Sequence, residues 1–477
     1  MKINGKNISL VTADSRKVIP GCLFVAVKGF AGDGHAYIPQ AVEKGAAVVM
    51  YDADTLAPEV EAALAKVTAI KVDDSRLALA QAADEFYDHP SSKLKLVGIT
   101  GTNGKTTTVT LLHQLFMNLG YNCGLLSTIA NFVGKRETET TNTTSDPVTI
   151  NRLMADMVNE GCEYCFMEVS SIGMEQQRVA ALHFAAGIFS NLTHDHLDYH
   201  KTFAEYLRCK KLFFDGLSSD AVAITNIDDK NGKVMVQNTA ARVVTYALGA
   251  MADHNCRIME ESFDGMLLKI DGEEVWTRLI GRHNAYNLLA IYTTALELGA
   301  TKEEALVGIS KLDSAKGRLE TLKGPRNLSV ILDYAHTPDA LENVLSTLKD
   351  IAKDGQQVIA VFGCGGDRDR TKRPEMAAVA EKYADRIIIT SDNSRSEKTE
   401  DIIAEIKTGL SARGLAKALS IADRAEAIRT AIMTAPDGAA ILLAGKGHET
   451  YQIIGTEHRH FDEREVVRDV FNSIEAI

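Results

Sequence analysis

The sequence predicts an α/β protein of three domains, with a central parallel sheet that carries a P-loop for a mononucleotide and a C-terminal doubly wound, Rossmann-like sheet. Three observations lead to this prediction. Apolar runs of strand length alternate with helical patterns, which is typical of parallel sheets. One of these runs is followed by a Gly-rich loop and then by a helical pattern. The 477 residues suffice for roughly three domains of about 150 residues each.

Composition and charge exclude several classes of protein. Apolar residues make up 45% of the chain and charged residues 24%, as in ordinary globular proteins, so a disordered chain and a small disulfide-stapled fold are excluded. The formal net charge is −12, which leaves no broad basic surface to hold DNA or an anionic membrane. We therefore expect small-molecule partners and no nucleic acid, and any phosphate must bind at a local site.

The cysteines and the apolar runs indicate the compartment. The seven cysteines are odd in number and scattered, which predicts free thiols in a reducing environment. Cys162 and Cys165 form a CxxC without a second ligand pair, so we expect them to pack at the start of a strand. The N-terminus lacks the pattern of a signal peptide, and no apolar stretch approaches the roughly 20 residues of a membrane helix. We expect a cytoplasmic protein without membrane insertion.

The first domain is expected at residues 1–90. Its apolar runs predict two strands and its helical patterns predict two helices. In chain order these lie at 23–27, 36–44, 46–51 and 77–88. The polar segment 88–95 contains Pro90 and two serines, which is typical of a linker.

The second domain is expected at residues 91–322 and the third at 323–477. The strands predicted for the second lie at 96–100, 165–170, 185–192 and 221–226, and its later helices at 283–298 and 302–311. Alternation and an Asp-Gly turn signal between 256 and 280 predict antiparallel ribbons beside this sheet. The strands predicted for the third domain, with helical patterns between them, lie at 328–334, 357–363, 386–390 and 439–445.

The Gly-rich loop, GITGTNGKT at residues 98–106, has the strand-then-helix context of a P-loop. Glycines let backbone N–H groups converge on phosphate oxygens, and the helix N-terminus adds a partial positive charge. Lys105 would reach the β- and γ-phosphates, and the Thr106 hydroxyl would hold Mg²⁺. The generic pattern would place its first glycine at Ile99, whereas this loop has Gly98 and Gly101. A plain Gly-rich turn is the alternative.

Two further segments could supply metal ligands. The predicted strand 165–170 carries Glu168, whose carboxylate could bind Mg²⁺ directly or through water; a solvated or ion-paired side chain is the alternative. The run NLTHDHLDYH at 191–200 concentrates histidines and aspartates after a strand, at the sheet end where α/β sites form. A metal or phosphate site and an ordinary polar loop are equally open for this run.

Four motifs occur in the order in which the Mur ligases have them: TGTNGKTTT, MEVSS, NLTHDHLDYH and GRHNAYN. The chain therefore resembles the Mur ligases, ATP-dependent amide ligases of peptidoglycan precursor synthesis, over essentially its whole length. The early-glycine form of the P-loop is the family's own variant. Residues 14–38 are similar to the UDP-binding domain of those members that extend UDP-N-acetylmuramoyl-L-alanyl-D-glutamate by a third amino acid.

The resemblance implies which residues bind ATP and magnesium, with two Mg²⁺ ions expected. The catalytic residues would be Lys105, Glu168, His196 and Lys210. The metal ligands would be Thr106, Glu168, His196 and Lys210, the last as a carbamate (N6-carboxylysine). ATP would be bound by Gly101, Thr102, Asn103, Gly104, Lys105, Thr106, Thr107, Asn284, Arg318 and His336.

The resemblance also implies contacts to the nucleotide substrate. Ser15, beside Arg16, matches a position that binds the uridine part. The muramoyl-dipeptide part would be held by Asn142, Thr143, Thr144, Ser170, Gln176 and Arg178.

The C-terminal domain would choose the incoming amino acid. Its run Asp392-Asn393-Ser394-Arg395 resembles the DNPR motif of the members that add meso-diaminopimelate, with Ser394 in place of the proline. Diaminopimelate has a second zwitterionic end whose carboxylate a guanidinium can bind bidentately, whereas lysine has no such carboxylate. The diaminopimelate contacts would be Arg368, Asp392, Asn393, Arg395, Gly445 and Glu449.

These residues predict a ligation in two steps. The γ-carboxylate of the D-glutamyl residue attacks the γ-phosphate of ATP, and the amine of diaminopimelate then displaces phosphate from the acyl phosphate. The alternatives are the same ligation with L-lysine or another diamino acid, a ligase like folylpolyglutamate synthase, and a nucleotide switch without chemistry. Residues 14–38 argue against the folylpolyglutamate synthase-like reading, because such a ligase lacks the uridine-binding domain. We expect the protein to be monomeric.

Overall fold

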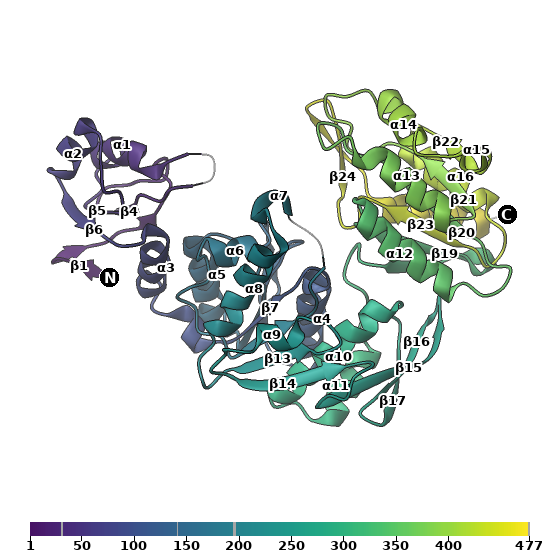
Figure 1. Ribbon diagram of the computed structural model, residues 1–477, viewed down its shortest axis with the longest axis horizontal. Helices are drawn as coiled ribbons and strands as arrows, with labels where there is room; N and C mark the ends of the chain where they lie inside the picture. Colours follow the sequence, from purple (N-terminus) through teal and green to yellow (C-terminus); the bar gives the residue numbers. More distant parts are fainter. Residues whose placement is uncertain (30–31, 141, 194–196, 476–477) are drawn as a thin grey trace. The chain divides into compact units, whose positions relative to one another are not determined.

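The structure, a computed structural model, describes residues 1–29, 32–140, 142–193 and 197–475, which form two compact units (Figure 1). The first unit consists of Met1–Asn255 and Tyr286–Gly308, and the second of Cys256–Ala285 and Ile309–Ile477. Both units are built from sheets with helices packed on them, so the predicted α/β class is confirmed. The domain boundaries after residues 90 and 322 stay predictions.

The N-terminal part of the first unit is a four-stranded parallel sheet with helices on both faces. The strands, in sheet order, are β3 (Val11–Thr12), β4 (Leu23–Val25), β5 (Val48–Tyr51) and β6 (Thr68–Lys71). The helices are α1 (Ile38–Glu43), α2 (Pro58–Leu64) and α3 (Ser75–Phe86). Successive residues of a strand face opposite sides: Phe24 packs with α1 and α2, while Leu23 and Val25 pack with α3. A small hairpin, β1 (Lys2–Ile3) and β2 (Lys6–Asn7), precedes this sheet.

The segment 88–95 is not a linker, contrary to the prediction. It forms the 3-10 helix η2 (Pro90–Lys93), in which Pro90 and Ser91 are buried. The backbone N–H of His183 donates to the Ser91 hydroxyl at 3.0 Å, so a residue far along the chain fixes this turn. The other polar side chains of the segment, which suggested a linker, are exposed on this turn.

The central sheet of the first unit has the order β10-β9-β8-β11-β7-β12-β13-β14. Its strands are β7 (Lys95–Thr100), β8 (Cys123–Leu126), β9 (Asn131–Val133), β10 (Arg136–Thr138), β11 (Tyr164–Glu168), β12 (Ala186–Phe189), β13 (Val222–Asn226) and β14 (Arg242–Ala247). The strands from β8 to β14 are parallel, and β9 and β10 add an antiparallel edge. Because β7 lies between β11 and β12, the loops after these three strands meet at one edge of the sheet.

Helices cover both faces of this sheet. They are α4 (Lys105–Asn118), α5 (Pro147–Asn159), α6 (Ser171–Glu175), α7 (Leu197–His200), α8 (Phe203–Asp215), α9 (Gly232–Met235), α10 (Arg282–Glu297) and α11 (Lys302–Ser310). Phe116 of α4 packs on Tyr164 and Phe166 of β11, with ring centroids 4.6 and 5.3 Å apart. Cys165 and Met167, the alternate residues of β11, pack instead in the core that α5 and α8 cover. Cys165 thus packs in a core at the start of β11, as predicted for this cysteine of the CxxC.

The second unit begins with the predicted antiparallel ribbon and continues as a six-stranded sheet. The ribbon consists of β15 (His254–Ser262), β16 (Gly265–Ile270) and β17 (Glu273–Thr277). The sheet, in spatial order, consists of β18 (Glu320–Lys323), β19 (Ser329–Asp333), β23 (Ala440–Ala444), β20 (Val358–Phe362), β21 (Arg386–Ile389) and β22 (Ala418–Ser420). All its strands are parallel except the edge strand β18.

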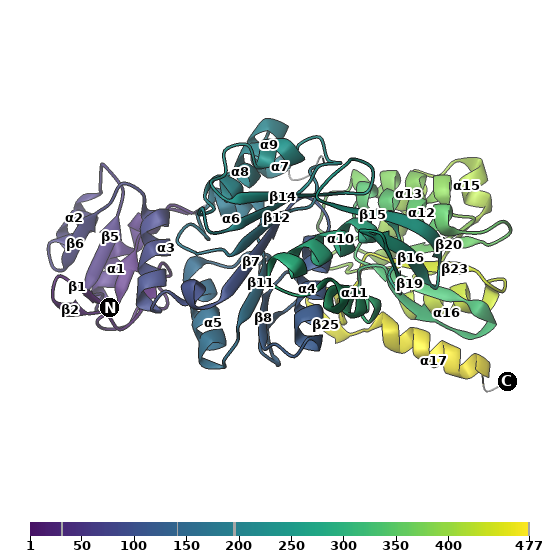
Figure 2. The same cartoon turned by 90° about the horizontal axis from the view of Figure 1, so that it is seen from below.

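This second sheet is doubly wound, as predicted. Its helices are α12 (Pro338–Ile351), α13 (Lys372–Tyr383), α14 (Thr399–Lys407), α15 (Ala412–Ala416), α16 (Arg424–Thr434) and α17 (Glu463–Glu475). One core joins the sheet to α12, α13 and α14, and the other joins it to α16 and α17. Figure 2 shows α12 and α13 on one face of the sheet and α16 and α17 on the other. A hairpin, β24 (Tyr451–Ile454) and β25 (Glu457–His460), follows β23.

Two predictions about cysteines and membranes can be compared with this fold. All seven cysteines are free thiols and all are buried. Within residues 1–29, 32–140, 142–193 and 197–475, no helix has both the length and the apolar character needed to cross a membrane.

Candidate active site

The loop between β7 and α4 has a backbone that only glycine permits at two positions. Gly101 has a φ of 152°, and a Cβ on it would lie 2.0 Å from Ser190 Oγ. Gly104 has a φ of 87°, and its Cβ would lie 2.5 Å from Asn287 Oδ1. The loop therefore turns tightly before α4 and keeps its N–H groups near the helix N-terminus, as a phosphate loop requires.

The residues after β12 hold this loop in place. Ser190 Oγ donates to the carbonyl of Asn103 at 2.7 Å, and the Asn103 N–H donates to Asn191 Oδ1 at 3.0 Å. The Thr102 N–H donates to the Asn191 carbonyl. These bonds explain why β12 ends at Phe189, although the apolar run predicted a strand to residue 192.

Lys105 and the two threonines after it form the first turn of α4. The Lys105 ammonium donates to the carbonyls of Gly101 and Thr102, at 2.9 and 2.8 Å, so it lies across its own loop. Thr106 and Thr107 are buried. This arrangement places one cation and one hydroxyl at the N-terminus of α4, which suits a polyphosphate.

Glu168, the last residue of β11, faces the Thr106 hydroxyl. Its Oε1 accepts from Thr106 Oγ1 and from the Thr128 N–H, both at 2.8 Å. Its Oε2 is buried and, among the described residues, has no hydrogen-bond partner. A buried carboxylate oxygen without a donor fits a cation ligand, because an unpaired buried charge is costly.

The described residues contain no group of three or more His, Cys, Asp or Glu side chains that could hold a metal. A Mg²⁺ ion here would therefore take Glu168, the Thr106 hydroxyl and phosphate oxygens of a nucleotide as ligands. His196, the other predicted ligand, lies outside the described residues.

Lys210 on α8 reaches the same loop. Its side chain is buried, its ammonium donates to the Gly101 carbonyl at 2.6 Å, and it lies 4.7 Å from the centre of the Tyr206 ring. The Tyr206 hydroxyl in turn lies 3.1 Å from Thr102 Oγ1. The neighbouring Lys211 instead pairs with Asp215 one turn further along α8. Of the two adjacent lysines, only Lys210 is directed at the P-loop.

The residues predicted to hold the muramoyl-dipeptide form a chain of hydrogen bonds that begins at Glu168. Thr144 Oγ1 donates to the Glu168 carbonyl at 2.9 Å and accepts from the Ser170 N–H at 3.0 Å. Thr143 Oγ1 accepts from Thr128, and Ser170 Oγ caps α6. The Arg178 guanidinium donates to the Thr144 carbonyl and to Gln176 Oε1. Asn142 precedes them, with its carbonyl accepting from Thr140.

A cavity of about 780 Å³ lies beside this chain of residues. Its wall includes Gln176 and residues that the sequence reasoning did not select, namely Lys28, Asp52, Asp74, Arg76, Glu175, Tyr199 and His200. The Gln176 amide donates to the Tyr199 hydroxyl, which donates to Glu175, and Glu175 pairs with Arg76 at 3.3 Å. The volume is in the range of ligand sites, and residues from α3 and α6 share the wall.

Ser15 is placed apart from this chain of residues. It is buried, and its carbonyl accepts from the Lys44 ammonium at 2.9 Å. Arg16 is exposed and forms a bidentate pair with Asp14, which lowers the pKa of the Asp14 carboxyl to about 2. In the described part of the chain, no hydrogen bond joins Ser15 to the other predicted substrate residues.

The second unit gathers two of the remaining predicted residues, Arg318 and His336, around a tyrosine, together with His448, which was not predicted. Arg318 lies over the Tyr334 ring at 5.2 Å, and His336 and His448 lie 4.7 and 5.0 Å from the same ring. Arg318 Nε is buried and has no hydrogen-bond partner among the described residues, which leaves a donor for an anion. Asn284, also predicted to contact ATP, is buried and donates to the Ile280 carbonyl.

The six residues predicted to bind diaminopimelate follow three neighbouring strands of the second unit. Arg368 follows β20, Asp392, Asn393 and Arg395 follow β21, and Gly445 and Glu449 follow β23. The Asn393 amide donates to Glu449 Oε2 at 3.1 Å, and Arg395 donates to the Gly366 carbonyl at 2.8 Å. Carboxylate, amide and guanidinium groups therefore meet at one sheet edge, where open α/β sheets bind ligands.

Lys446 belongs to this cluster and was missed by the sequence reasoning. Its side chain is fully buried, and its ammonium lies 3.1 Å from Glu449 Oε2, 3.3 Å from Asn393 Oδ1 and 3.7 Å from Asp392. The sequence did offer a signal for Lys446, because it lies between Gly445 and Glu449, which were both predicted to bind diaminopimelate. Lys446 offsets part of the negative charge of the two carboxylates, so the cluster carries both signs of charge, which suits a zwitterion.

The fold and these clusters define a class of protein, an ATP-dependent ligase with a P-loop unit and an amino-acid-binding unit. The chain belongs to the Mur ligase family. Residues 7–87 match the Mur ligase family catalytic domain, residues 99–295 the Mur ligase middle domain, and residues 317–447 the Mur ligase glutamate ligase domain.

Curated relatives agree with this assignment over nearly the full chain. A protein of Cytophaga hutchinsonii named UDP-N-acetylmuramoyl-L-alanyl-D-glutamate–2,6-diaminopimelate ligase is 49% identical over 468 residues, which is 98% of this chain and 95% of the relative. A protein of the same name from Phocaeicola vulgatus is 50% identical over 468 residues, with the same coverage. A solved structure of a ligase of this name matches with a TM-score of 0.73 and 30% identity, covering 100% of this chain and 98% of that one.

Proposed function

We propose that this Mur ligase joins meso-diaminopimelate to UDP-N-acetylmuramoyl-L-alanyl-D-glutamate and uses ATP to activate the γ-carboxylate of the glutamyl residue. The observation that carries the proposal is the cluster after β20, β21 and β23, in which Arg368 and Arg395 accompany Asn393, Glu449 and Lys446. Guanidinium groups suit the distal carboxylate of diaminopimelate, and Glu449 suits its distal ammonium. The curated relatives carry the name of the same activity.

Activation of the carboxylate would take place at the P-loop. Lys105 and the loop amides would neutralise the triphosphate, so that a carboxylate can approach the γ-phosphate. Magnesium, when bound by Glu168 and Thr106, would supply further positive charge at the phosphates. The residues from Thr143 to Arg178 would hold the dipeptide next to this loop, since Thr144 is hydrogen bonded to Glu168 itself.

We also propose that Lys210 carries a carbamate during the reaction. A buried ammonium that donates to the Gly101 carbonyl is already next to the P-loop. A carbamate at its Nζ would be anionic and would present oxygens, the ligands that Mg²⁺ prefers. His196 is proposed as a further ligand on the resemblance alone.

The rival substrates differ at the distal end. L-Lysine offers an ammonium without a carboxylate, so Arg368 and Arg395 would remain without an anionic partner. A ligase like folylpolyglutamate synthase is disfavoured, because residues 7–87 match a Mur ligase domain. The division into three domains, the monomeric state and the cytoplasmic location stay predictions; the seven free cysteines are in keeping with a reducing compartment.

The proposal is tested by phosphate release with the purified chain. Omitting ATP, the UDP-muramoyl-dipeptide or diaminopimelate should abolish release, and the full mixture should yield a nucleotide product heavier by one diaminopimelate minus water. Release that does not depend on the UDP-muramoyl-dipeptide would contradict the proposal. If phosphate is released with that nucleotide and lysine but not with diaminopimelate, the proposal that diaminopimelate is the amino acid added would be refuted.

A further inference from the structure

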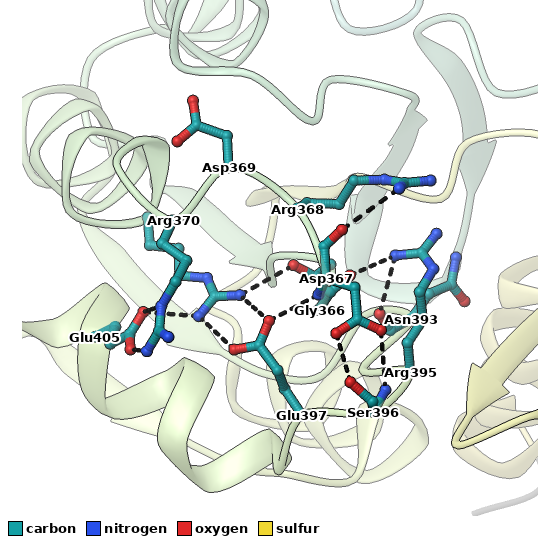
Figure 3. A network of polar contacts seen from close by, with 12 residues as sticks. Gly366, Asp367, Arg368, Asp369, Arg370, Asn393, Arg395, Ser396, Glu397 and Glu405 are labelled. Atoms are coloured by element: carbon teal, nitrogen blue, oxygen red, sulfur yellow. Dashed lines mark hydrogen bonds and ion pairs between the residues drawn. The ribbon is translucent and has the colours of Figure 1, made fainter. Parts of the chain in front are cut away.

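Two loops of the second unit carry the arginines proposed to bind the distal carboxylate. Residues 363–371, after β20, contain Arg368, and residues 390–398, after β21, contain Arg395; we call them the two arginine loops. They are bonded to each other directly. The Gly366 N–H donates to the Asn393 carbonyl at 2.9 Å, Arg395 Nη1 donates to the Gly366 carbonyl at 2.8 Å, and Asp367 accepts from the Ser396 N–H and hydroxyl (Figure 3).

The contact between the loops holds the backbone in conformations that side chains disfavour. Asp367 and Arg395 have φ values of 54° and 50°, in the left-handed region. At Gly366 a Cβ would lie 1.9 Å from the Ser394 carbonyl oxygen. Non-glycine residues adopt such angles at a cost and keep them only where neighbouring structure imposes them. We therefore expect residues outside the two arginine loops to help hold them in this conformation.

Arg373, at the start of α13, supplies such a constraint through bonds to both loops. Its side chain is fully buried. Its guanidinium donates to both carboxylate oxygens of Glu397 at 2.9 and 2.8 Å, to Glu405 of α14 at 2.7 Å, and to the Gly365 carbonyl at 3.3 Å. Arg373 is thus bonded to the backbone of one arginine loop and to a carboxylate of the other.

Glu397, in the loop after β21, is bonded to the backbone of the loop after β20. Its Oε1 accepts from the backbone N–H of Asp367 at 2.7 Å while it pairs with Arg373. The arginine and this amide lower the pKa of the Glu397 carboxyl to about 2, so it stays ionised at neutral pH. Each of the two side chains therefore contacts both arginine loops, and a bidentate guanidinium–carboxylate pair fixes orientation as well as distance.

The guanidinium groups proposed to bind the distal carboxylate point away from Glu405, a partner of Arg373. In Figure 3 the guanidinium groups of Arg368 and Arg395 point to one side, whereas Arg370 and Glu405 lie toward the other. The Arg395 guanidinium uses only Nη1 for the Gly366 and Asn393 carbonyls, and the described residues offer its Nε and Nη2 no hydrogen-bond partner. Those donors remain for a carboxylate.

We propose that Arg373 and Glu397 are a positioning pair that sets the spacing of Arg368 and Arg395, and so makes the site selective for amino acids with a distal carboxylate. The inference rests on the proposed function. Neither residue would touch the substrate. Weakening the pair should reduce the affinity for the distal carboxylate and leave the ATP site of the first unit unchanged.

The test compares kinetic constants of Glu397→Gln and Arg373→Lys with those of the wild type. Each variant keeps part of the hydrogen bonding but loses the bidentate ion pair. We expect the KM for diaminopimelate to rise about tenfold or more, as the loss of one charge-assisted bond implies, with kcat and the KM for ATP within about threefold. The ratio of kcat/KM for diaminopimelate to that for L-lysine should fall by a similar factor.

A control and a milder variant accompany these two. Lys382→Ala, on the same helix α13 as Arg373, removes an exposed ion pair with Glu342 of α12 and should leave every constant unchanged. Ser396→Ala removes only the exposed hydroxyl bond to Asp367 and should raise the KM for diaminopimelate about threefold. If the buried variant Arg373→Lys fails to fold, an unchanged KM in Glu397→Gln, whose side chain is 22% exposed, overturns the inference.

The outcomes separate this inference from the proposed function. If the wild type does not ligate diaminopimelate, the proposed function is wrong and the inference falls with it. If the wild type ligates diaminopimelate and folded Glu397→Gln and Arg373→Lys keep its KM and the ratio to lysine, only the inference is wrong. A fall in kcat with unchanged KM would also overturn the inference, because the positions of Arg368 and Arg395 should affect the binding of diaminopimelate.

Discussion

Thr106 Oγ1 donates a hydrogen bond of 2.8 Å to Glu168 Oε1, which joins the first turn of α4 to the end of β11. The bond follows from the strand order, because β11 and β7 are parallel neighbours with Glu168 opposite Ile99. The other carboxylate oxygen is buried, and no described residue donates to it. The geometry thus leaves one oxygen of Glu168 for a ligand beside the phosphate loop.

Glu168→Gln should remove most of the activity without unfolding the chain. Glutamine can still accept from Thr106 and the Thr128 amide, but it brings no negative charge for Mg²⁺. We expect phosphate release to fall by about 100-fold or more, measured across a magnesium titration. Glu163→Gln, an exposed change just before the same strand, is the matched control. Full activity of Glu168→Gln would exclude this carboxylate as a metal ligand.

Lys105→Ala should abolish transfer of the γ-phosphate. The ammonium now lies on the Gly101 and Thr102 carbonyls and is the cation of this loop nearest the expected phosphates. We expect a loss of about 100-fold or more in kcat/KM for ATP, measured by phosphate release at varied ATP. Lys95→Ala, at the exposed start of β7, the strand that precedes this loop, should change little. Equal effects of the two variants would contradict the P-loop assignment.

Lys210 should take up carbon dioxide. With ¹³C-labelled bicarbonate, the wild type should give a carbamate ¹³C NMR signal that is absent from Lys210→Ala and retained in Lys211→Ala. Lys210→Ala should also lose nearly all phosphate release. Activity that is unchanged after removal of bicarbonate, together with no labelled signal, would show that the lysine acts as an ammonium.

Much of this site could be predicted from residue patterns, and the rest depends on contacts between distant segments. The P-loop was predictable because glycines, Lys105 and Thr106 are adjacent in the chain. The burial of Lys446 and the pairing of Arg373 with Glu397 were not, because they arise only when the loops after β20, β21 and β23 meet. Segment 88–95 was mistaken for a linker, since composition alone does not reveal that Ser91 accepts a bond from His183.

Stability should fall as the pH drops below neutrality, partly because of His448. Burial, with nearby Arg318 and Arg464, lowers the pKa of His448 to about 4 from its ordinary value of 6.5. Between these values the unfolded chain binds more protons than the folded one, so acid favours unfolding. From pH 7 to pH 5 this histidine alone should cost about 2 kcal/mol.

The measurement is the unfolding midpoint of His448→Gln at pH 7 and pH 5. The variant should lose less stability than the wild type over this interval. His460 provides a control of opposite sign, because its pair with Glu465 raises its pKa, and it therefore stabilises the fold at low pH and loses that effect as the pH rises. If the stability of His448→Gln and that of the wild type change equally between pH 7 and pH 5, the lowered pKa of His448 is contradicted.

The most direct test of the central claim is a competition between diaminopimelate and lysine. The chain is given ATP, Mg²⁺ and UDP-N-acetylmuramoyl-L-alanyl-D-glutamate with equal concentrations of meso-diaminopimelate and L-lysine, and the nucleotide products are identified by mass. The arginine loops predict that the diaminopimelate product dominates by about 100-fold or more, because lysine cannot form the charge-assisted bonds that a distal carboxylate would make with half-buried Arg395 and exposed Arg368. A lysine product in equal or greater amount would contradict the account.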